Sequence, residues 1–140
     1  MKNTHAAAAI MMLVAAPALS QTPQALLEQA MLLGPAQLGD AGGQLTIFGQ
    51  AGTAAYSADL SGPDCTLEGA GCDQIRFTSI APPADQSVID AWNAAAEGGT
   101  LTLDQGWLRL TSDAAVAGDG APAFSGWNRL LSQFAQSFDP

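Results

Sequence analysis

Basic side chains, and the residues that most catalytic sites require, are scarce in this chain of 140 residues. It has one histidine, His5, one lysine, Lys2, and two cysteines, and its other basic residues are three arginines. His5 and Lys2 both lie in the N-terminal segment, before the predicted domain. That domain therefore cannot form a Ser-His-Asp or Cys-His site, a lysine Schiff base, or a zinc site with imidazole ligands.

The first 20 residues have the features of a secretory signal peptide. Lys2 precedes an apolar run from Ala6 to Ala16, and Ala18 and Ser20 occupy the small-residue positions of a cleavage site. The run is too short to cross a bilayer, which takes about 20 apolar residues. We therefore expect residues 1–20 to be removed, which leaves one domain of residues 21–140 in the periplasm or outside the cell, without stable membrane insertion.

The predicted mature chain is strongly acidic. Three arginines (Arg76, Arg109 and Arg129) oppose thirteen Asp and Glu residues, so its formal net charge is −10. Nucleic acids and anionic membranes attract basic surfaces, so neither is an expected partner. The charge suits a soluble exported protein or contact with a basic partner.

Sequence motifs for cofactors and metals are missing as well. The chain has no glycine-rich dinucleotide motif, no P-loop, no G-x-S-x-G motif and no calcium-loop spacing, so we expect no cofactor and no metal ion. Carboxylates are the remaining candidates for acid–base chemistry. Asp59 with Asp64, or Asp113 with Asp119, could form the pair of a hydrolase. Because these residues fall in predicted turns and strand ends, where Asp is common, catalysis is the less favoured interpretation.

The two cysteines, Cys65 and Cys72, lie in a predicted loop over 61–73 that is rich in glycine. An even number of cysteines in an exported protein predicts a disulfide. A redox-active pair is the alternative, but such pairs usually have the spacing C-x-x-C at a helix start. We therefore predict a structural disulfide.

Apolar periodicity and turn residues predict an α+β domain with an antiparallel sheet of about five strands, in the order α-β-β-β-α-β-β-α. Residues 36–43 are expected to be a glycine-bearing connection, and residues 112–120 a polar linker. The predicted helices cover 23–33 after an N-cap at Thr22, 86–96 after an N-cap at Asp85, and 122–138; the predicted strands cover 44–50, 54–60, 74–80, 100–104 and 107–111.

The hairpin over 100–111 has a predicted register. If Gln105 and Gly106 form a two-residue turn, Leu103 faces Leu108 and Leu101 faces Leu110. All four leucines then share one face of the hairpin, as a half-buried sheet requires.

Apolar residues recur along one side of the last predicted helix with spacings of three and four residues. Packing of this side against the sheet is the favoured interpretation, and a partner-binding or dimer seam is the alternative, because four aromatic residues are many for one terminal helix. The residues concerned are Phe124, Trp127, Leu131, Phe134 and Phe138.

Trp92 and Asn93 are assigned structural roles. Trp92 continues the apolar stripe of Val88 and Ile89, so we expect it to pack in the core with its indole N–H bonded to the backbone. The Asn93 amide is expected to tie its helix to a neighbouring loop.

Several segments together resemble the YbjN-domain proteins. They are the run 72–77 (CDQIRF), the run 88–93 (VIDAWN), the leucine hairpin, and the pattern F-x-x-W…L-x-x-F of the last helix. The resemblance covers residues 22–138 in the order of elements and is specific from Cys65 onward. It implies the fold of type III secretion chaperones and a role as a regulator of sensory transduction, with no catalytic residues.

Composition and resemblance together predict an exported, non-enzymatic domain that acts through protein–protein contact, as a chaperone-like or regulatory helper. The partner is another protein, and a homodimer is one form of this contact. A domain that binds a small molecule or lipid between helices and sheet is an alternative, and a carboxylate-dependent hydrolase is the least favoured.

Overall fold

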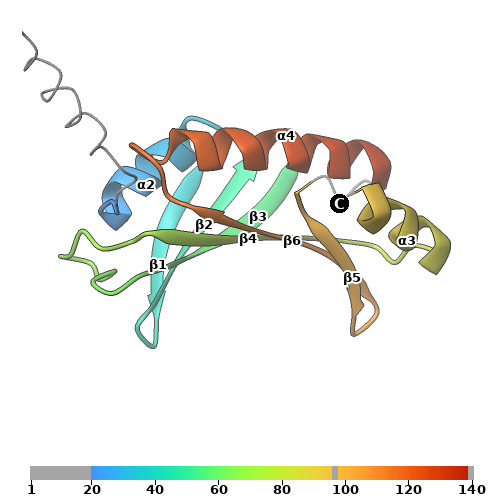
Figure 1. Cartoon of the computed structure of the whole chain (residues 1–140), viewed down its shortest axis with the longest axis horizontal. Coiled ribbons are helices and arrows are strands. Elements are labelled where there is room, and N and C mark those ends of the chain that lie inside the picture. The colour runs from blue at the N-terminus through green and yellow to red at the C-terminus, as the bar shows by residue number, and fades with distance from the viewer. Residues whose placement is uncertain (1–19, 96–97, 139–140) are drawn as a thin grey trace, which may run out of the picture.

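The computed structural model describes residues 20–95 and 98–138, so the predicted signal peptide, Ser20 excepted, lies outside the described residues. Within those ranges the chain is an α+β domain with three helices and one six-stranded antiparallel sheet (Figure 1). The elements in chain order are α2 (Pro23–Met31), β1 (Ala36–Ala41), β2 (Gln44–Ala51), β3 (Ala54–Ser61), β4 (Gln74–Ala81), α3 (Gln86–Ala95), β5 (Thr100–Asp104), β6 (Trp107–Ala115) and α4 (Ala121–Phe138).

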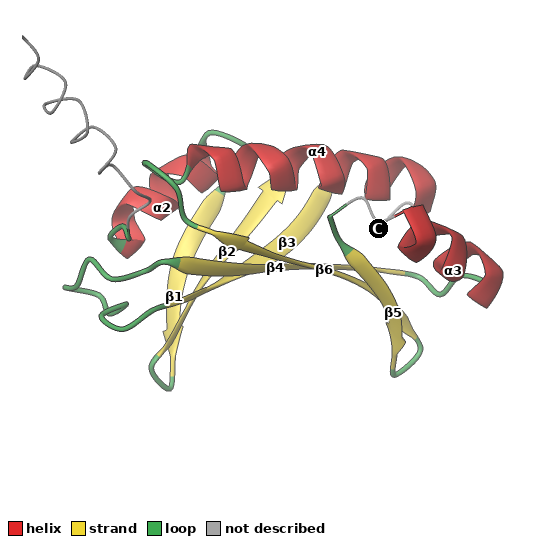
Figure 2. Cartoon of the chain, in the orientation of Figure 1, coloured by secondary structure: helices red, strands yellow, loops and turns green. Residues whose placement is uncertain are grey.

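The strands lie in the order β1-β2-β3-β4-β6-β5, so β1 and β5 are the two edges. Thr22 caps α2, because its hydroxyl accepts a hydrogen bond from the Ala25 amide at 3.1 Å. Helices α2 and α4 lie on one face of the sheet, and α3 lies beside β5 (Figure 2). The α+β class and the order of most elements are thus as predicted.

The prediction for residues 36–43 was wrong, because this segment contains a sixth strand. β1 pairs with β2 through a tight turn in which Gly42 and Gly43 have φ values of 63° and 88°. The Asp40 carboxylate accepts a hydrogen bond from the Gly43 amide at 3.1 Å and closes this turn. The Phe48 side chain covers Gly39 within β1, where a Cβ would come within 3.1 Å of the ring. Glycine here belongs to a hairpin and not to a loose connection.

The predicted linker over 112–120 was also too long, because β6 continues to Ala115. Its added residues pair with the start of β4, and the Arg76 guanidinium binds the Asp113 carboxylate across this pair at 2.8 Å. Small residues such as Ala114 and Ala115 carry a weak strand signal of their own. Pairing with β4 holds them in the sheet.

The last helix packs on the sheet along its apolar seam. Phe124, Trp127, Leu131 and Phe134 are at most 2% exposed, and Phe138 is partly buried against them. The Trp127 ring stacks on Phe77 of β4 with centroids 5.0 Å apart. Of the two interpretations of this seam, core packing is therefore correct, and these side chains are not available as a partner-binding surface.

The hairpin β5–β6 has the predicted register, with Leu103 opposite Leu108 and Leu101 opposite Leu110. Gln105 and Gly106 form the two-residue turn with φ values of 54° and 86°, as a hairpin turn of the mirror-image type requires. Leu103 remains 45% exposed because it lies near the end of the hairpin.

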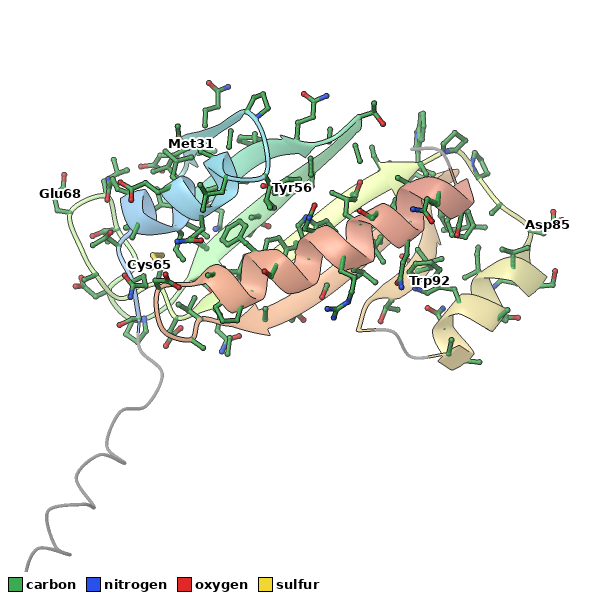
Figure 3. The ribbon with its side chains drawn as sticks, turned by 90° about the horizontal axis from the view of Figure 1, so that it is seen from above. Met31, Tyr56, Cys65, Glu68, Asp85 and Trp92 are labelled. Atoms are coloured by element: carbon green, nitrogen blue, oxygen red, sulfur yellow. A yellow bond between two sulfur atoms is a disulfide. The ribbon has the colours of Figure 1, made fainter. Side chains whose placement is uncertain are left out.

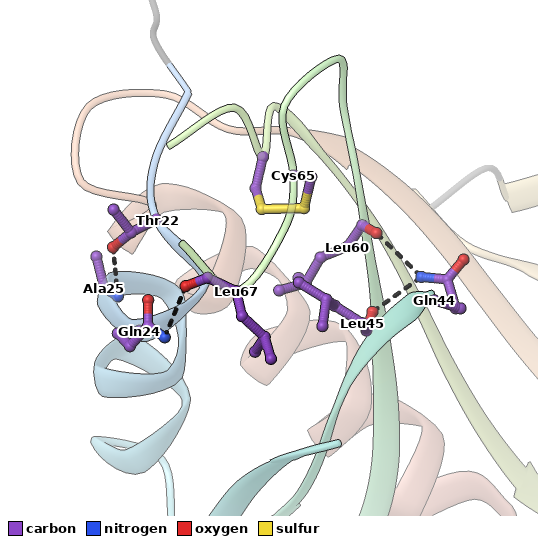
Figure 4. The surroundings of a disulfide bond; sticks show 9 residues. Thr22, Gln24, Ala25, Gln44, Leu45, Leu60, Cys65 and Leu67 are labelled. Carbon is purple, nitrogen blue, oxygen red and sulfur yellow. Dashed lines mark hydrogen bonds between the residues drawn. A yellow bond between two sulfur atoms is a disulfide. The ribbon is translucent and has the colours of Figure 1, made fainter. Parts of the chain in front are cut away.

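The predicted disulfide between Cys65 and Cys72 is present, with Cα atoms 4.4 Å apart (Figure 4). Cys72 is fully buried, and its backbone exchanges two hydrogen bonds with Gln21, at 3.0 and 3.1 Å. The Gln24 amide of α2 also donates to the Leu67 carbonyl within the loop at 3.3 Å. The disulfide loop thus holds the start of the domain against the sheet.

Removal of the disulfide should lower the free energy of unfolding by about 2.5 kcal/mol, because closing so short a loop restricts the unfolded chain. We expect this loss in urea titrations of the double variant Cys65→Ala, Cys72→Ala. Wild-type protein in excess reductant is the matched control and should unfold at the same urea concentration as the variant. Equal stability of the oxidised and the reduced wild-type protein would contradict the prediction.

Tyr56 of β3 is buried against the aromatic seam. Its ring meets Trp127 edge-on with centroids 5.9 Å apart, and a side chain at Gly49 would come within 2.6 Å of it. Its hydroxyl has no hydrogen-bond partner among the described residues. Burial raises the pKa of Tyr56 from 10.0 to about 12.

This raised pKa predicts a loss of stability in alkali. As pH rises, the unfolded chain releases the Tyr56 proton before the folded chain does, so the free energy of unfolding is undiminished below pH 10.0 and falls towards about pH 12. The loss should reach up to about 3 kcal/mol. The measurement is denaturant unfolding across this pH range.

The reference for this measurement is the variant Tyr56→Phe, whose stability should stay level over the same range. The comparison is clean because residues 21–140 contain no lysine and only one tyrosine, and both cysteines are in the disulfide. An equally steep fall in Tyr56→Phe would show that another group is responsible.

Candidate functional site

Three of the four acidic residues considered for catalysis, all except Asp64, have hydrogen-bond partners for their side chains in the structure. Asp59 accepts a hydrogen bond from the Thr46 hydroxyl at 2.8 Å, and Asp119 accepts one from the Ala121 amide at the start of α4. Asp113 binds Arg76 through two hydrogen bonds of 2.8 and 3.2 Å. The hydrogen bond from Arg76 lowers the pKa of Asp113, so this group is ionised at neutral pH and is not a general acid.

Two hollows of the described surface are poorly matched to small ligands. One of about 360 Å³ lies around the Arg76–Asp113 pair and is lined mainly by polar side chains, whereas ligand pockets are mostly apolar. A hollow of about 190 Å³ beside α4 includes Phe77 and Trp127, but it is smaller than the roughly 300 Å³ of typical ligand pockets. Within residues 20–95 and 98–138, no three His, Cys, Asp or Glu side chains gather as metal ligands would.

The two edges of the sheet differ, and this difference defines the candidate site. At the β5 edge, Asn93 of α3 faces Leu101. Its amide donates to the Leu101 carbonyl at 2.9 Å and its carbonyl oxygen accepts from the Leu101 amide at 2.8 Å. Asn93 therefore bonds to this edge as a neighbouring strand would.

Trp92 supports the same contact. Its indole N–H donates to the Gly99 carbonyl at 3.2 Å, and its ring packs on Phe134 and Phe138 of α4 with centroids 6.4 and 5.8 Å away. The Trp92 indole thus bonds to the backbone as predicted, although Trp92 is only partly buried, and Asn93 ties α3 to an edge strand and not to a loop. In Figure 3, Trp92 and Asp85 mark this end of the molecule.

The β1 edge has no such cover among the described residues. The Gln50 amide donates a hydrogen bond to the Pro35 carbonyl at 3.0 Å, so residues 35 and 50 form a hydrogen-bonded pair. Together with the register, this pair fixes which β1 residues bond to β2 and which point away from it. Residues 37, 39 and 41 then point their backbone groups towards β2, whereas Ala36, Leu38 and Asp40 point theirs outward. No hydrogen bond of the described structure uses these outward groups. They form an unpaired strand edge that can accept another strand.

Exposed apolar side chains surround this edge. Met31 and Leu32, at the end of α2 just before β1, are 55% and 78% exposed, and Phe48 of β2 is 54% exposed over Gly39. Met31 lies at the end of the molecule that also carries Cys65 and Glu68, opposite Trp92 and Asp85 (Figure 3). We call the β1 edge together with Met31, Leu32 and Phe48 the β1 surface.

The half of the chain that carries the β1 surface has a single sign of charge. Residues 20–75 contain no lysine, arginine or histidine and have six acidic residues, namely Glu28, Asp40, Asp59, Asp64, Glu68 and Asp73. Two of the three arginines are engaged elsewhere, Arg76 with Asp113 and Arg109 with Asp104, both at 2.8 Å. The β1 surface therefore belongs to a segment whose formal net charge is 0 − 6 = −6, and Asp40 lies on the edge itself.

The β1 surface was missed at the level of sequence because residues 36–43 were interpreted as a connection. A signal was present, since Gly42-Gly43 is a two-residue turn pair between the segments 36–41 and 44–51. The partner-binding candidates chosen instead are in the core.

Comparison of the chain with models of protein families, with curated proteins and with solved structures found no match. None of the helices in the described ranges has the length and hydrophobicity that a membrane-spanning helix needs.

The cover of the β5 edge by Asn93 can be tested by substitution. Asn93→Ala leaves both backbone groups of Leu101 without a partner, so we expect a loss of about 1 kcal/mol in the free energy of unfolding and faster hydrogen exchange at the Leu101 amide. Asn128→Ala, on the exposed side of α4, is the matched control and should change stability by less than about 0.5 kcal/mol. Unchanged exchange at Leu101 in Asn93→Ala would contradict the assignment.

Proposed function

We propose that this protein is an exported, non-enzymatic domain that acts by contact with another protein, and that an extended segment of that protein binds to the β1 surface. The main support is the asymmetry of the sheet. At the β5 edge the Asn93 side chain bonds to Leu101, one of two outward-pointing residues, whereas the β1 edge presents three residues with free backbone groups beside exposed apolar side chains. Uncovered edges of this kind bind strands in many recognition domains.

The disulfide supports the export part of the proposal, since such bonds persist in oxidising compartments. The placement of the acidic residues supports a non-enzymatic role, because Asp59, Asp113 and Asp119 are each engaged in structural hydrogen bonds. The order of helices and strands is consistent with the resemblance to YbjN-domain proteins. A chaperone-like or regulatory helper is the role that this resemblance implies.

Site-specific photocrosslinking in the exporting cell tests the proposal. A photoreactive residue in place of Gln37, an exposed residue of β1, should give a discrete adduct with another polypeptide chain. The same residue in place of Gln133, on the exposed side of α4, is the matched control and should give none. The adduct at position 37 should disappear when Leu38→Pro is added, because proline blocks an outward amide without removing a β1–β2 hydrogen bond.

Equal adducts at positions 37 and 133, or adducts at 133 alone, would contradict contact through the β1 surface. Circular dichroism of each variant, with and without Leu38→Pro, shows that the fold is retained. An adduct with a second copy of the chain would still support contact through this surface.

A further inference from the structure

We infer that the segment bound by the β1 surface is basic: an extended stretch of about six residues that carries lysine or arginine between apolar side chains. This inference rests on the proposed function and names the chemistry of the partner. The proposed contact does not by itself require a partner of either charge. The basic character of the segment is inferred from the acidic residues around the edge.

The backbone sets the length and the alternation of the segment. β1 spans Ala36–Ala41 and offers outward groups at three alternate residues, so an added strand of about six residues would satisfy them. Successive side chains of that strand point to opposite faces of the sheet. Those on the face opposite the helices lie towards the exposed Phe48 ring, which favours apolar residues there, whereas those on the helix-covered face lie on the same side as Asp40, whose register partner Leu45 is buried.

The charge sets the chemistry of the other side chains. Residues 20–75 carry six acidic and no basic residues, and Asp40 lies on the edge itself. A basic segment is attracted by this field, and a neutral or acidic one is not.

A second copy of the chain is the less favourable occupant. Pairing β1 with the β1 of another copy would bring together two halves that each hold six acidic residues and no base. Like charges placed together across an interface oppose association. The same argument disfavours any acidic partner.

Two synthetic peptides of ten residues test the inference on the purified protein. In one, lysine alternates with valine; in the other, glutamate replaces every lysine. Fluorescence anisotropy should show binding of the lysine peptide at least about tenfold tighter than that of the glutamate peptide, weakening as salt is added. Hydrogen exchange should slow at the Ala36, Leu38 and Asp40 amides when the lysine peptide binds.

Three charge variants and one backbone variant sharpen the test. Asp40→Lys should weaken binding of the lysine peptide about fivefold or more. Asp90→Lys, on the exposed side of α3 at the opposite end, makes the same change in net charge and should alter binding less than twofold. Leu38→Pro should weaken binding at least about tenfold, because it blocks an outward backbone group. Asp40→Lys also loses the hydrogen bond that closes the β1–β2 turn, so Asp40→Asn, which removes the charge but can still accept from the Gly43 amide, should weaken binding too; this test stands even if Leu38→Pro does not fold.

Three outcomes would overturn the inference. The first is equal or tighter binding of the glutamate peptide, or no binding of either peptide. The second is binding of the lysine peptide that does not slow exchange at the three β1 amides, or that Asp40→Lys and Asp90→Lys weaken equally. Either result would indicate diffuse attraction of the peptide to an acidic protein. The third is a stable dimer in light scattering that Asp40→Lys strengthens and that slows exchange along β1; it would replace the basic segment by a second copy. In each case the crosslinks from position 37 still decide the proposed function independently.

Discussion

The packing of α4 across the sheet is the interaction on which the rest of this structure depends. Trp127 stacks on Phe77 with ring planes 9° apart, and Phe124 meets the same Phe77 ring edge-on with centroids 5.2 Å apart. Both arrangements suit aromatic pairs, and rings of this size bury much of the apolar area of so small a domain. Because Phe77 lies on a central strand, one contact joins the last helix to the middle of the sheet.

This packing leaves the sheet with one covered face, one polar face and two edges. Proteins usually protect such edges, and the β5 edge is protected at Leu101 by the Asn93 amide, while Trp92 packs against the end of α4. The β1 edge is short, and Asp40 lies near its end. These features limit uncontrolled pairing but leave the outward groups of β1 accessible. The open edge is therefore compatible with the proposed binding of a strand, and in that proposal the acidic residues favour a basic segment.

Much of the fold was predictable because the signals were local. The leucine hairpin, the disulfide loop and the seam of the last helix each depend on the spacing of residues near one another in the chain. The failures have physical causes too. β1 contains glycine and few strand-forming residues, and it is held by pairing with β2 and by the Phe48 ring over Gly39. The end of β6 consists of small residues that β4 holds in the sheet. In both places the partner strand overrides a weak local preference.

The candidate site was the least predictable part. Composition alone determined that residues 21–140 lack histidine and lysine and carry a large negative charge, and the two cysteines determined the disulfide. Only the tertiary structure decided that the aromatic seam is buried, that Asn93 covers Leu101, and that β1 is left open. The reason is that the backbone N–H and C=O groups of a strand need hydrogen-bond partners whatever its sequence. Whether these groups find partners depends on which element lies beside the strand, and that neighbour is determined by the order of strands in the sheet.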